Sequence, residues 1–207
     1  MPPEPTVFVV DDDPAMRESL RWLLQSVGLA VETHAGAAAF LSSYDPSRSG
    51  CLVLDMRMPG MSGLNLQDEL IARRITLPII IITGYAEVPT AVRALKRGAV
   101  DFIEKPFSDE LLLDRIRQAI ETDRQTRDAE AQRAEVTVRF AQLTPREREV
   151  MELVIAGKAN KVIAAELGLS PKTVEVHRAN VMRKMAVDSV AELVRLGLIV
   201  APGQGKS

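Results

Sequence analysis

The first part of the chain alternates short apolar runs with segments whose apolar residues recur every three or four positions. The apolar runs are rich in β-branched residues and end in turn residues, a pattern typical of buried strands. These runs are 6–10, 30–34, 51–55, 78–83 and 100–104. The helical segments between and after them are 15–27, 37–43, 64–74, 89–97 and 108–120. The alternation predicts an α/β fold, a five-stranded, doubly wound, flavodoxin-like parallel sheet with helices on both faces.

Beyond the last of these helices the apolar stripe fades into a charged segment. Asp123 lies four positions before Arg127, a spacing at which opposite charges stabilise a solvated helix. Glu135 and Arg139 have the same spacing. The preceding helix is therefore expected to run on as a semi-rigid linker over 123–142, while a flexible tether fits the composition nearly as well.

The final segment, 143–207, has helical patterning and no strand signal. A capping box opens its first helix, with Thr144 as the cap, Pro145 at the first position and Glu147 at the third. Two later helices are joined by a short turn at Gly168, the helix-turn-helix pattern, and a fourth helix closes the unit. The chain is thus expected to hold a sheet domain, a linker and a four-helix all-α domain, over 1–122, 123–142 and 143–207.

Charge is spread unevenly between these two domains. Residues 1–122 hold 12 Lys and Arg against 17 Asp and Glu, a net charge of −5. Residues 143–207 hold 10 against 7, a net charge of +3. An acidic domain followed by a mildly basic one predicts two different kinds of partner.

The expected cellular location of the protein rests on the absence of targeting and membrane-spanning segments in the sequence. No apolar run approaches the ~20 residues of a membrane span, and the N-terminus has no basic region followed by an apolar one. The single cysteine, Cys51, opens an apolar strand and is expected to be a buried thiol in a reducing compartment. We therefore expect a cytoplasmic protein without a membrane partner.

Three consecutive aspartates, Asp11, Asp12 and Asp13, follow the first strand directly. Two such charges ~5 Å apart cost about 3 kcal/mol at an effective dielectric of ~20. Asp13 stands before Pro14 and is accounted for as a helix cap. The other two carboxylates require a cation or another ligand.

Later strands also end in polar residues, namely Asp55, Thr83 and Lys105. Because ligands of a doubly wound sheet sit beyond the carboxyl ends of its strands, these side chains should converge with the first aspartates. A hard divalent cation suits such a cluster, and Mg²⁺ suits it better than Ca²⁺, since Mg²⁺ typically takes one or two carboxylates, waters and a phosphoryl oxygen. The arrangement resembles a phosphoryl acceptor, in which Asp55 attacks while the metal and Lys105 neutralise the phosphoryl oxygens.

Four ordered motifs, VVDDD, LDMRMPGMSG, IITG and DFIEKPF, resemble the receiver domain of two-component response regulators. By position, the resemblance implies that Asp55 is the phosphoacceptor and that Asp11 and Asp12 bind the metal. It also implies that Arg57 lends its backbone carbonyl to Mg²⁺. Lys105 would pair with the phosphoryl group, and the peptide bond that follows it would be cis.

The same resemblance implies a conformational switch. Thr83 would move toward the phosphoryl group, and Phe102 would turn inward and reshape the surface of the fourth helix and fifth strand. A dimer face is expected there, with Val92, Lys96 and Asp101 on it.

The string SPKTVEVHRANVM resembles the LuxR-type DNA-binding domain, most closely that of the FixJ group of nitrogen-fixation and aromatic-degradation regulators. Helical spacing after Pro171 places one stripe inward: Val174, His177, Val181 and Met185. The opposite stripe is expected in a major groove: Lys172, Glu175, Val176, Ala179 and Arg183. There Val176 would touch a thymine methyl and Glu175 would accept from a cytosine amino group. The candidates for phosphate contacts are Asn160, Lys161, Thr173, Arg178 and Lys184.

Together these patterns predict a transcriptional response regulator that catalyses only its own Mg²⁺-dependent phosphorylation and dephosphorylation. The expected partners are a sensor histidine kinase, promoter DNA, a second copy of the phosphorylated chain and RNA polymerase. Two alternatives stay open at this point. A haloacid-dehalogenase-like phosphatase also uses an aspartate and Mg²⁺, but it places its nucleophile after the first strand, whereas Asp55 follows the third. A sigma-like helical domain would sequester a protein instead of binding DNA. A footprint on promoter DNA would distinguish DNA binding from protein sequestration.

Overall fold

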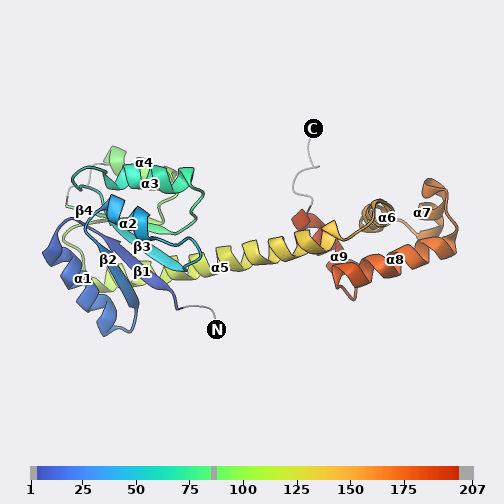
Figure 1. Cartoon of the computed structure of the whole chain (residues 1–207), viewed down its shortest axis with the longest axis horizontal. Coiled ribbons are helices and arrows are strands. Elements are labelled where there is room, and N and C mark those ends of the chain that lie inside the picture. The colour runs from blue at the N-terminus through green and yellow to red at the C-terminus, as the bar shows by residue number, and fades with distance from the viewer. Residues whose placement is uncertain (1–3, 85–87, 201–207) are drawn as a thin grey trace. The chain divides into compact units, whose positions relative to one another are not determined.

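The computed structural model describes residues 4–84 and 88–200, and the chain divides into two compact units, Met1–Arg127 and Asp128–Ser207. Figure 1 follows the chain from the strands of the first unit to the helices of the second. Over the described residues, no helix is both long and apolar enough to cross a membrane.

The predicted α/β fold of the first unit is confirmed. Its strands are β1 (Thr6–Val10), β2 (Ala30–His34), β3 (Gly50–Asp55), β4 (Ile79–Thr83) and β5 (Asp101–Glu104). Its helices are α1 (Pro14–Ser26), α2 (Ala37–Ser43), α3 (Gly63–Ala72), α4 (Val88–Lys96) and the first part of α5 (Asp109–Ala141). Within the described residues the strands form one parallel sheet in the order β2-β1-β3-β4-β5.

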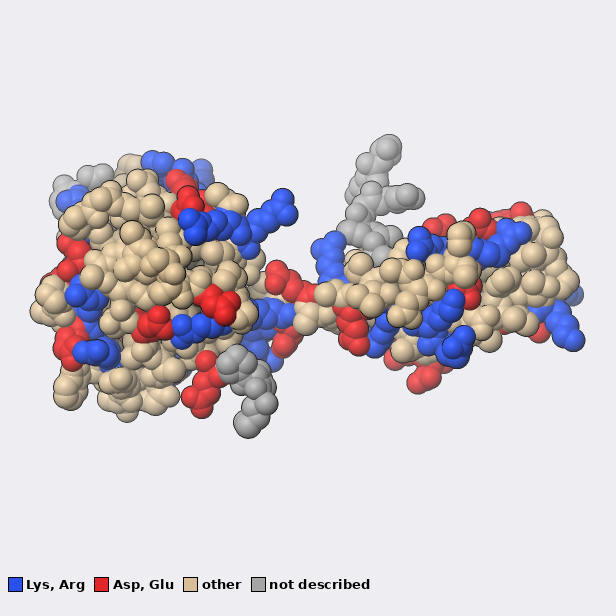
Figure 2. All heavy atoms as spheres, viewed as in Figure 1, with Lys and Arg blue, Asp and Glu red and all other residues tan. Residues whose placement is uncertain are grey.

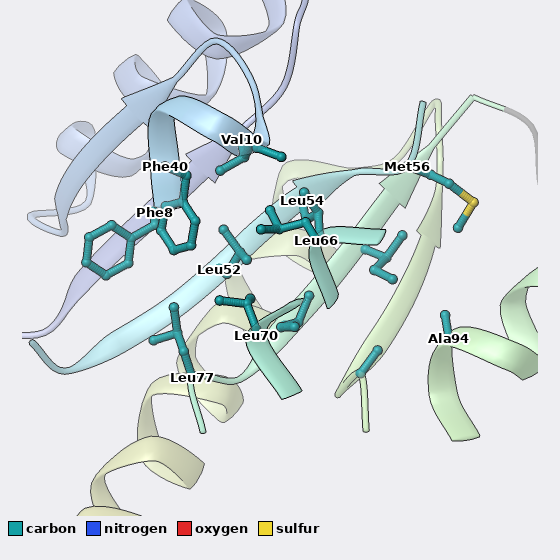
Figure 3. Packing of buried hydrophobic residues seen from close by; sticks show 14 of the residues in the cluster. Phe8, Val10, Phe40, Leu52, Leu54, Met56, Leu66, Leu70, Leu77 and Ala94 are labelled. Carbon is teal, nitrogen blue, oxygen red and sulfur yellow. The ribbon is translucent and has the colours of Figure 1, made fainter. Parts of the chain in front are cut away.

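Helices cover both faces of this sheet, which explains why its central strands are apolar along their whole length. On one face, Phe8 and Leu52 pack against α2 and α3 through Phe40, Leu66 and Leu70 (Figure 3). Residues of opposite parity in the same strands face α1 and α5. They form the second core cluster, which includes Val7, Val9, Cys51, Val53, Leu24 and Ile116.

Helix α5 is continuous through the segment expected to be a linker, but its first ion pair is not solvated as the spacing suggested. Asp123 is only 1% exposed, and its Oδ2 accepts hydrogen bonds from Gly50 N (2.9 Å) and Arg127 Nε (2.8 Å). The Arg127 guanidinium also donates to the backbone carbonyls of residues 46, 47 and 48, in the loop before β3. Gly50 itself cannot be replaced, because an added Cβ would lie 1.8 Å from the carbonyl oxygen of Thr6. Hydrogen bonds from the loop before β3 therefore hold α5 against the first unit up to Arg127.

Asp123→Ala is expected to destabilise the first unit by about 2–3 kcal/mol, because the buried Gly50 N–H loses its acceptor and the Arg127 guanidinium loses its carboxylate partner. Hydrogen exchange of the β3 amides in the full chain measures this loss. Asp114→Ala is the matched control, since Asp114 is an exposed acid of the same helix and its removal should change stability by less than about 0.5 kcal/mol. Equal protection of β3 in both variants would contradict the fastening role.

The second unit contains the end of α5 followed by α6 (Pro145–Ile155), α7 (Asn160–Leu167), α8 (Pro171–Met185) and α9 (Val190–Val200). The predicted capping box is present at α6, where Thr144 and Glu147 bond reciprocally. Helix α7 ends at Gly168, whose left-handed conformation (φ 65°) turns the chain into α8. The core of the unit gathers the inner faces of these helices around Val136, Val150, Ile163, Val174, Val181 and Met185.

Candidate functional site

Two carboxylates and one ammonium group meet at the carboxyl edge of the sheet. Lys105 Nζ lies 3.0 Å from Asp11 Oδ2 and 2.8 Å from Asp55 Oδ1. β1 and β3 are neighbours in the sheet, so the residues at their ends are adjacent. Asp11 and Asp55 are buried, whereas the Lys105 side chain is 21% exposed. One cation therefore bridges two buried acids at a point that solvent can reach.

The remaining oxygen of each carboxylate is held by the backbone. Asp11 Oδ1 accepts from the N–H of Asp13 (2.8 Å), and Asp55 Oδ2 accepts from the N–H of Arg57 (2.7 Å). Arg17, in the first turn of α1, donates to the carbonyl oxygen of Asp11 (2.7 Å). This contact of Arg17 was not predicted from the sequence. The only available signal was the position of Arg17 in the first turn of the helix that follows Asp11. The carboxylates are thus oriented before any ligand arrives.

The environment shifts the pKa values of the bridged groups. Burial raises the pKa of the Asp55 carboxyl, and it outweighs the opposing effect of the hydrogen bond from Lys105. Burial alone would lower the pKa of the Lys105 ammonium, but the hydrogen bonds from Lys105 to Asp55 and Asp11 outweigh it and raise that pKa. Lys105 therefore stays a cation while Asp55 is a more basic carboxylate than one in water.

The other predicted residues of this site lie around the bridge. Asp12 is exposed, next to buried Asp11. Thr83 is buried at the end of β4, and its carbonyl oxygen accepts from the N–H of Lys105 (2.7 Å). The peptide bond between Lys105 and Pro106 is cis, as the resemblance implied.

The oxygen-rich donor set fits a hard divalent cation. In the part of the chain that the structure describes, no three acidic, histidine or cysteine side chains are already arranged around one metal position. Asp11 and Asp55 nevertheless place carboxylate oxygens on the two sides of a single cation, Lys105 Nζ, and Asp12 adds a third acid in solvent beside them. Carboxylate oxygens of this kind are the ligands that Mg²⁺ prefers.

The predicted switch and dimer residues lie on α4 and β5. Phe102 is half-buried and packs against the core beneath α3 and α4. Val92 and Lys96 are exposed on α4. Asp101 is engaged within the unit, because its carboxylate lies 2.6 Å from Arg115 Nε and accepts from the N–H of Phe102. Helix α4 also exposes three apolar side chains: Val88, Val92 and Leu95.

On α8, the structure separates the two predicted stripes. The outward residues are all exposed: Lys172, Glu175, Val176, Ala179 and Arg183. Of the inward residues, Val174, Val181 and Met185 are buried and His177 is half-buried. Figure 2 shows basic and acidic side chains interspersed over the viewed face of this unit instead of one basic patch.

The candidates for phosphate contacts differ from one another. Lys161 is exposed, and Thr173 bonds the α8 cap residue Ser170. Arg178 donates to Asn160 Oδ1 (2.7 Å), which ties α8 to α7 and leaves other guanidinium N–H groups for a ligand.

Lys184, another candidate for a phosphate contact, is engaged within the unit. Its ammonium lies 2.6 Å from Glu147 Oε2 and also donates to the carbonyl oxygen of Gln142 (3.1 Å). The Lys184 ammonium therefore has an acidic partner within the unit, and its side chain is 23% exposed.

Comparisons with known proteins match both units. The family model described as the response regulator receiver domain matches residues 7–117, and the one described as bacterial regulatory proteins of the luxR family matches residues 141–196. The transcriptional regulatory protein FixJ of Azorhizobium caulinodans is 50% identical over 98% of this chain and 97% of its own length. The response regulator protein TodT of Pseudomonas putida is 44% identical over 92% of this chain and 84% of its own length.

Solved structures agree with these matches. The response regulator StyR is 48% identical, with a TM-score of 0.85 over 94% of this chain and 98% of its own. Full-length FixJ from B. japonicum is 46% identical, with a TM-score of 0.58 over 95% of this chain and 97% of its own.

Proposed function

Because the chain belongs to the response regulators that join a receiver domain to a LuxR-type DNA-binding domain, we propose that Asp55 is its phosphoacceptor and that phosphorylation promotes DNA binding by α8. The chain is a transcription regulator of the FixJ kind and not a metabolic enzyme. The observation that carries the assignment of Asp55 is the ammonium of Lys105, which lies within 3.0 Å of both Asp11 and Asp55. We place the protein in the cytoplasm, with a sensor histidine kinase as the donor and RNA polymerase as a later partner.

The residues of the site suit phosphoryl transfer to a carboxylate. An oxygen of Asp55 forms the bond to phosphorus as the bond from phosphorus to the kinase histidine nitrogen breaks, and that nitrogen keeps the electron pair. Lys105, already 2.8 Å from Asp55, then donates to a phosphoryl oxygen, and the hydroxyl of Thr83 closes on another. When bound, Mg²⁺ supplies positive charge against the phosphoryl oxygens. We assign its ligands to the side chains of Asp11, Asp12 and Asp55 and to the backbone carbonyl of Arg57.

The chain itself would supply all protein groups that this chemistry needs, including those for later attack of water on the acyl phosphate. Acetyl phosphate can therefore replace the kinase in a test. Incubation of the full chain with acetyl phosphate and Mg²⁺ is expected to add one phosphoryl group, which peptide mass spectrometry should find on Asp55. A stable modification on another residue, or labelling that is unaffected when Mg²⁺ is chelated, would refute the assignment.

We further propose that phosphorylated receivers pair through α4 and β5. The exposed apolar side chains Val88, Val92 and Leu95 make this face suitable for a second copy of the chain, and Lys96 stands beside them. A second copy would bring two α8 helices to paired half-sites on promoter DNA. Asp101 would act in this face through its ion pair with Arg115.

Lys96→Glu is expected to weaken the dimer formed with beryllofluoride by about tenfold while labelling by acetyl phosphate continues, because it reverses a charge on the face that meets the second copy. Sedimentation of the full chain with and without the mimic measures the shift. Arg21→Glu, a charge reversal on α1 at the other face of the sheet, should leave dimerisation unchanged. If wild type has the same mass in both conditions, this interface is wrong.

A further inference from the structure

The last turn of α8 contains two adjacent basic residues, Arg183 and Lys184, that differ in exposure and in their partners. Arg183 is exposed, and its guanidinium reaches Asn180 of the same helix at 3.5 Å. The side chain of Lys184 is 23% exposed and its ammonium lies 2.6 Å from Glu147 Oε2. Because successive residues of a helix point about 100° apart, one cation faces solvent while the next lies against the core beside Val181 and Met185.

Glu147 is a buried acid, and one of its carboxylate oxygens, Oε2, accepts from two donors. Its side chain is 5% exposed, and the oxygen that accepts from Lys184 also accepts from the N–H of Thr144 (2.8 Å). Burial favours the neutral acid, but the hydrogen bonds from Lys184 and Thr144 outweigh it, so the pKa of Glu147 is lowered and the group is ionised at neutral pH. A buried carboxylate requires a cation. Lys184 is that cation.

The contact joins three pieces of chain at one point. Glu147 belongs to the first turn of α6, Gln142 to the turn before α6, and Lys184 to the end of α8. The middle of α8 is tied separately to α7 by the bond from Arg178 to Asn160. Between these polar ties α8 rests on apolar side chains, whose contacts are far less directional than a charge-assisted hydrogen bond. A third bond, from Arg139 Nη1 of α5 to the carbonyl oxygen of Met185 (3.2 Å), holds the same end of α8. Of these ties, the one through Lys184 is the charge-assisted bond between two side chains that links the end of α8 to α6.

We propose that Lys184 is a positioning residue for DNA recognition: it fixes the end of α8 against α6, which places Glu175 and Val176 at the base edges, and it does not contact DNA itself. This inference rests on the DNA-binding role proposed above for α8. In this role the Lys184 ammonium contributes to sequence preference by positioning α8. A phosphate contact would instead contribute affinity without sequence preference.

The test uses the full chain with beryllofluoride and two duplexes of equal length. One duplex is enriched from a random-sequence library by the wild-type chain, and the other is its scrambled counterpart. Lys184→Met is expected to weaken binding to the enriched duplex by about tenfold, the loss of roughly one base contact, with little change for the scrambled duplex. The dependence of binding on salt should be unchanged, because no phosphate contact is lost. Lys184→Arg keeps the charge and the donors and should stay close to wild type.

Two further variants separate positioning from the alternatives. Lys161→Met removes the same charge from an exposed lysine that is a candidate for a phosphate contact, and it should weaken binding to both duplexes, with the salt slope lower by about one. In Lys184→Met combined with Glu147→Gln, glutamine keeps the capping box and no buried charge is left unpaired. This double variant should regain thermal stability without regaining preference for the enriched duplex. It replaces the single variant in the binding comparison if Lys184→Met does not fold.

Three results would overturn the inference. A uniform loss with a lower salt slope in Lys184→Met would make Lys184 a phosphate contact, as is proposed for Lys161. A double variant that recovers both stability and preference would leave Lys184 a purely structural role. A wild-type chain that enriches no duplex would refute DNA recognition by α8 itself, and that failure is distinguishable because it precedes any substitution.

Discussion

Asp55→Asn is expected to abolish the Mg²⁺-dependent incorporation of a phosphoryl group into the full chain. The asparagine side chain keeps the shape of the aspartate, and its oxygen can still accept from Lys105, but an amide does not act as the nucleophile in phosphoryl transfer. The receiver should therefore stay folded while labelling stops. Intact-mass measurement after incubation with acetyl phosphate reports both the yield and the number of groups added.

Two further variants serve as comparisons for Asp55→Asn. Asp12→Asn is also expected to stop labelling, because Asp12 is a proposed ligand of the Mg²⁺ ion that labelling requires. Asp45→Asn alters an exposed acid in the loop before β3 and should be labelled like wild type. Undiminished labelling of Asp55→Asn would remove Asp55 from its proposed role, whatever the other variants show.

Lys105→Met is expected to slow labelling about 10²-fold, the usual effect of removing one fixed donor from the charge that develops in a transition state. Two buried carboxylates, those of Asp11 and Asp55, would also lose the cation that they share. The rate of labelling by acetyl phosphate at saturating Mg²⁺ measures the change.

The pH profile distinguishes this electrostatic role from a structural one. Hydrogen bonding and attraction from Lys105 lower the pKa of Asp55 against the larger effect of burial, so their loss should raise that pKa further. Since the ionised carboxylate is the nucleophile, the acidic limb of the labelling rate should move to higher pH in Lys105→Met. An unshifted limb, or a rate within about twofold of wild type, would contradict the role given to Lys105.

The site at the edge of the sheet was predictable because its chemistry follows from topology. Parallel strands end at one edge, so polar residues that interrupt apolar runs must meet there, and Asp11, Asp55 and Lys105 do. The strand and helix pattern itself was clear because burial on both faces demands continuous apolar strands. What the pattern did not give is that Lys105 bonds both acids at once, since that depends on side-chain reach and not on spacing.

Two contacts were missed because they depend on distant segments. The spacing of Asp123 and Arg127 indicated a solvated pair, but the loop before β3 covers them from more than 70 residues away. The bond from Lys184 to Glu147 was not expected, although Lys184 follows buried Val181 by three positions and so borders the inner stripe of α8. The available signal was a lysine beside the inner stripe of α8 together with a capping-box glutamate earlier in the same domain. Charge alone did not distinguish a lysine that faces a groove from one that pairs within the unit.

One titration shows whether a phosphoryl group on Asp55 controls DNA binding by α8. The full chain and its Asp55→Asn variant are titrated against the enriched duplex, each with and without beryllofluoride. The mimic is expected to tighten binding of wild type by about tenfold or more, because paired receivers link two half-site contacts, and to leave Asp55→Asn unchanged. Equal affinity of wild type in both conditions, or an equal gain in Asp55→Asn, would contradict control by the phosphoryl group.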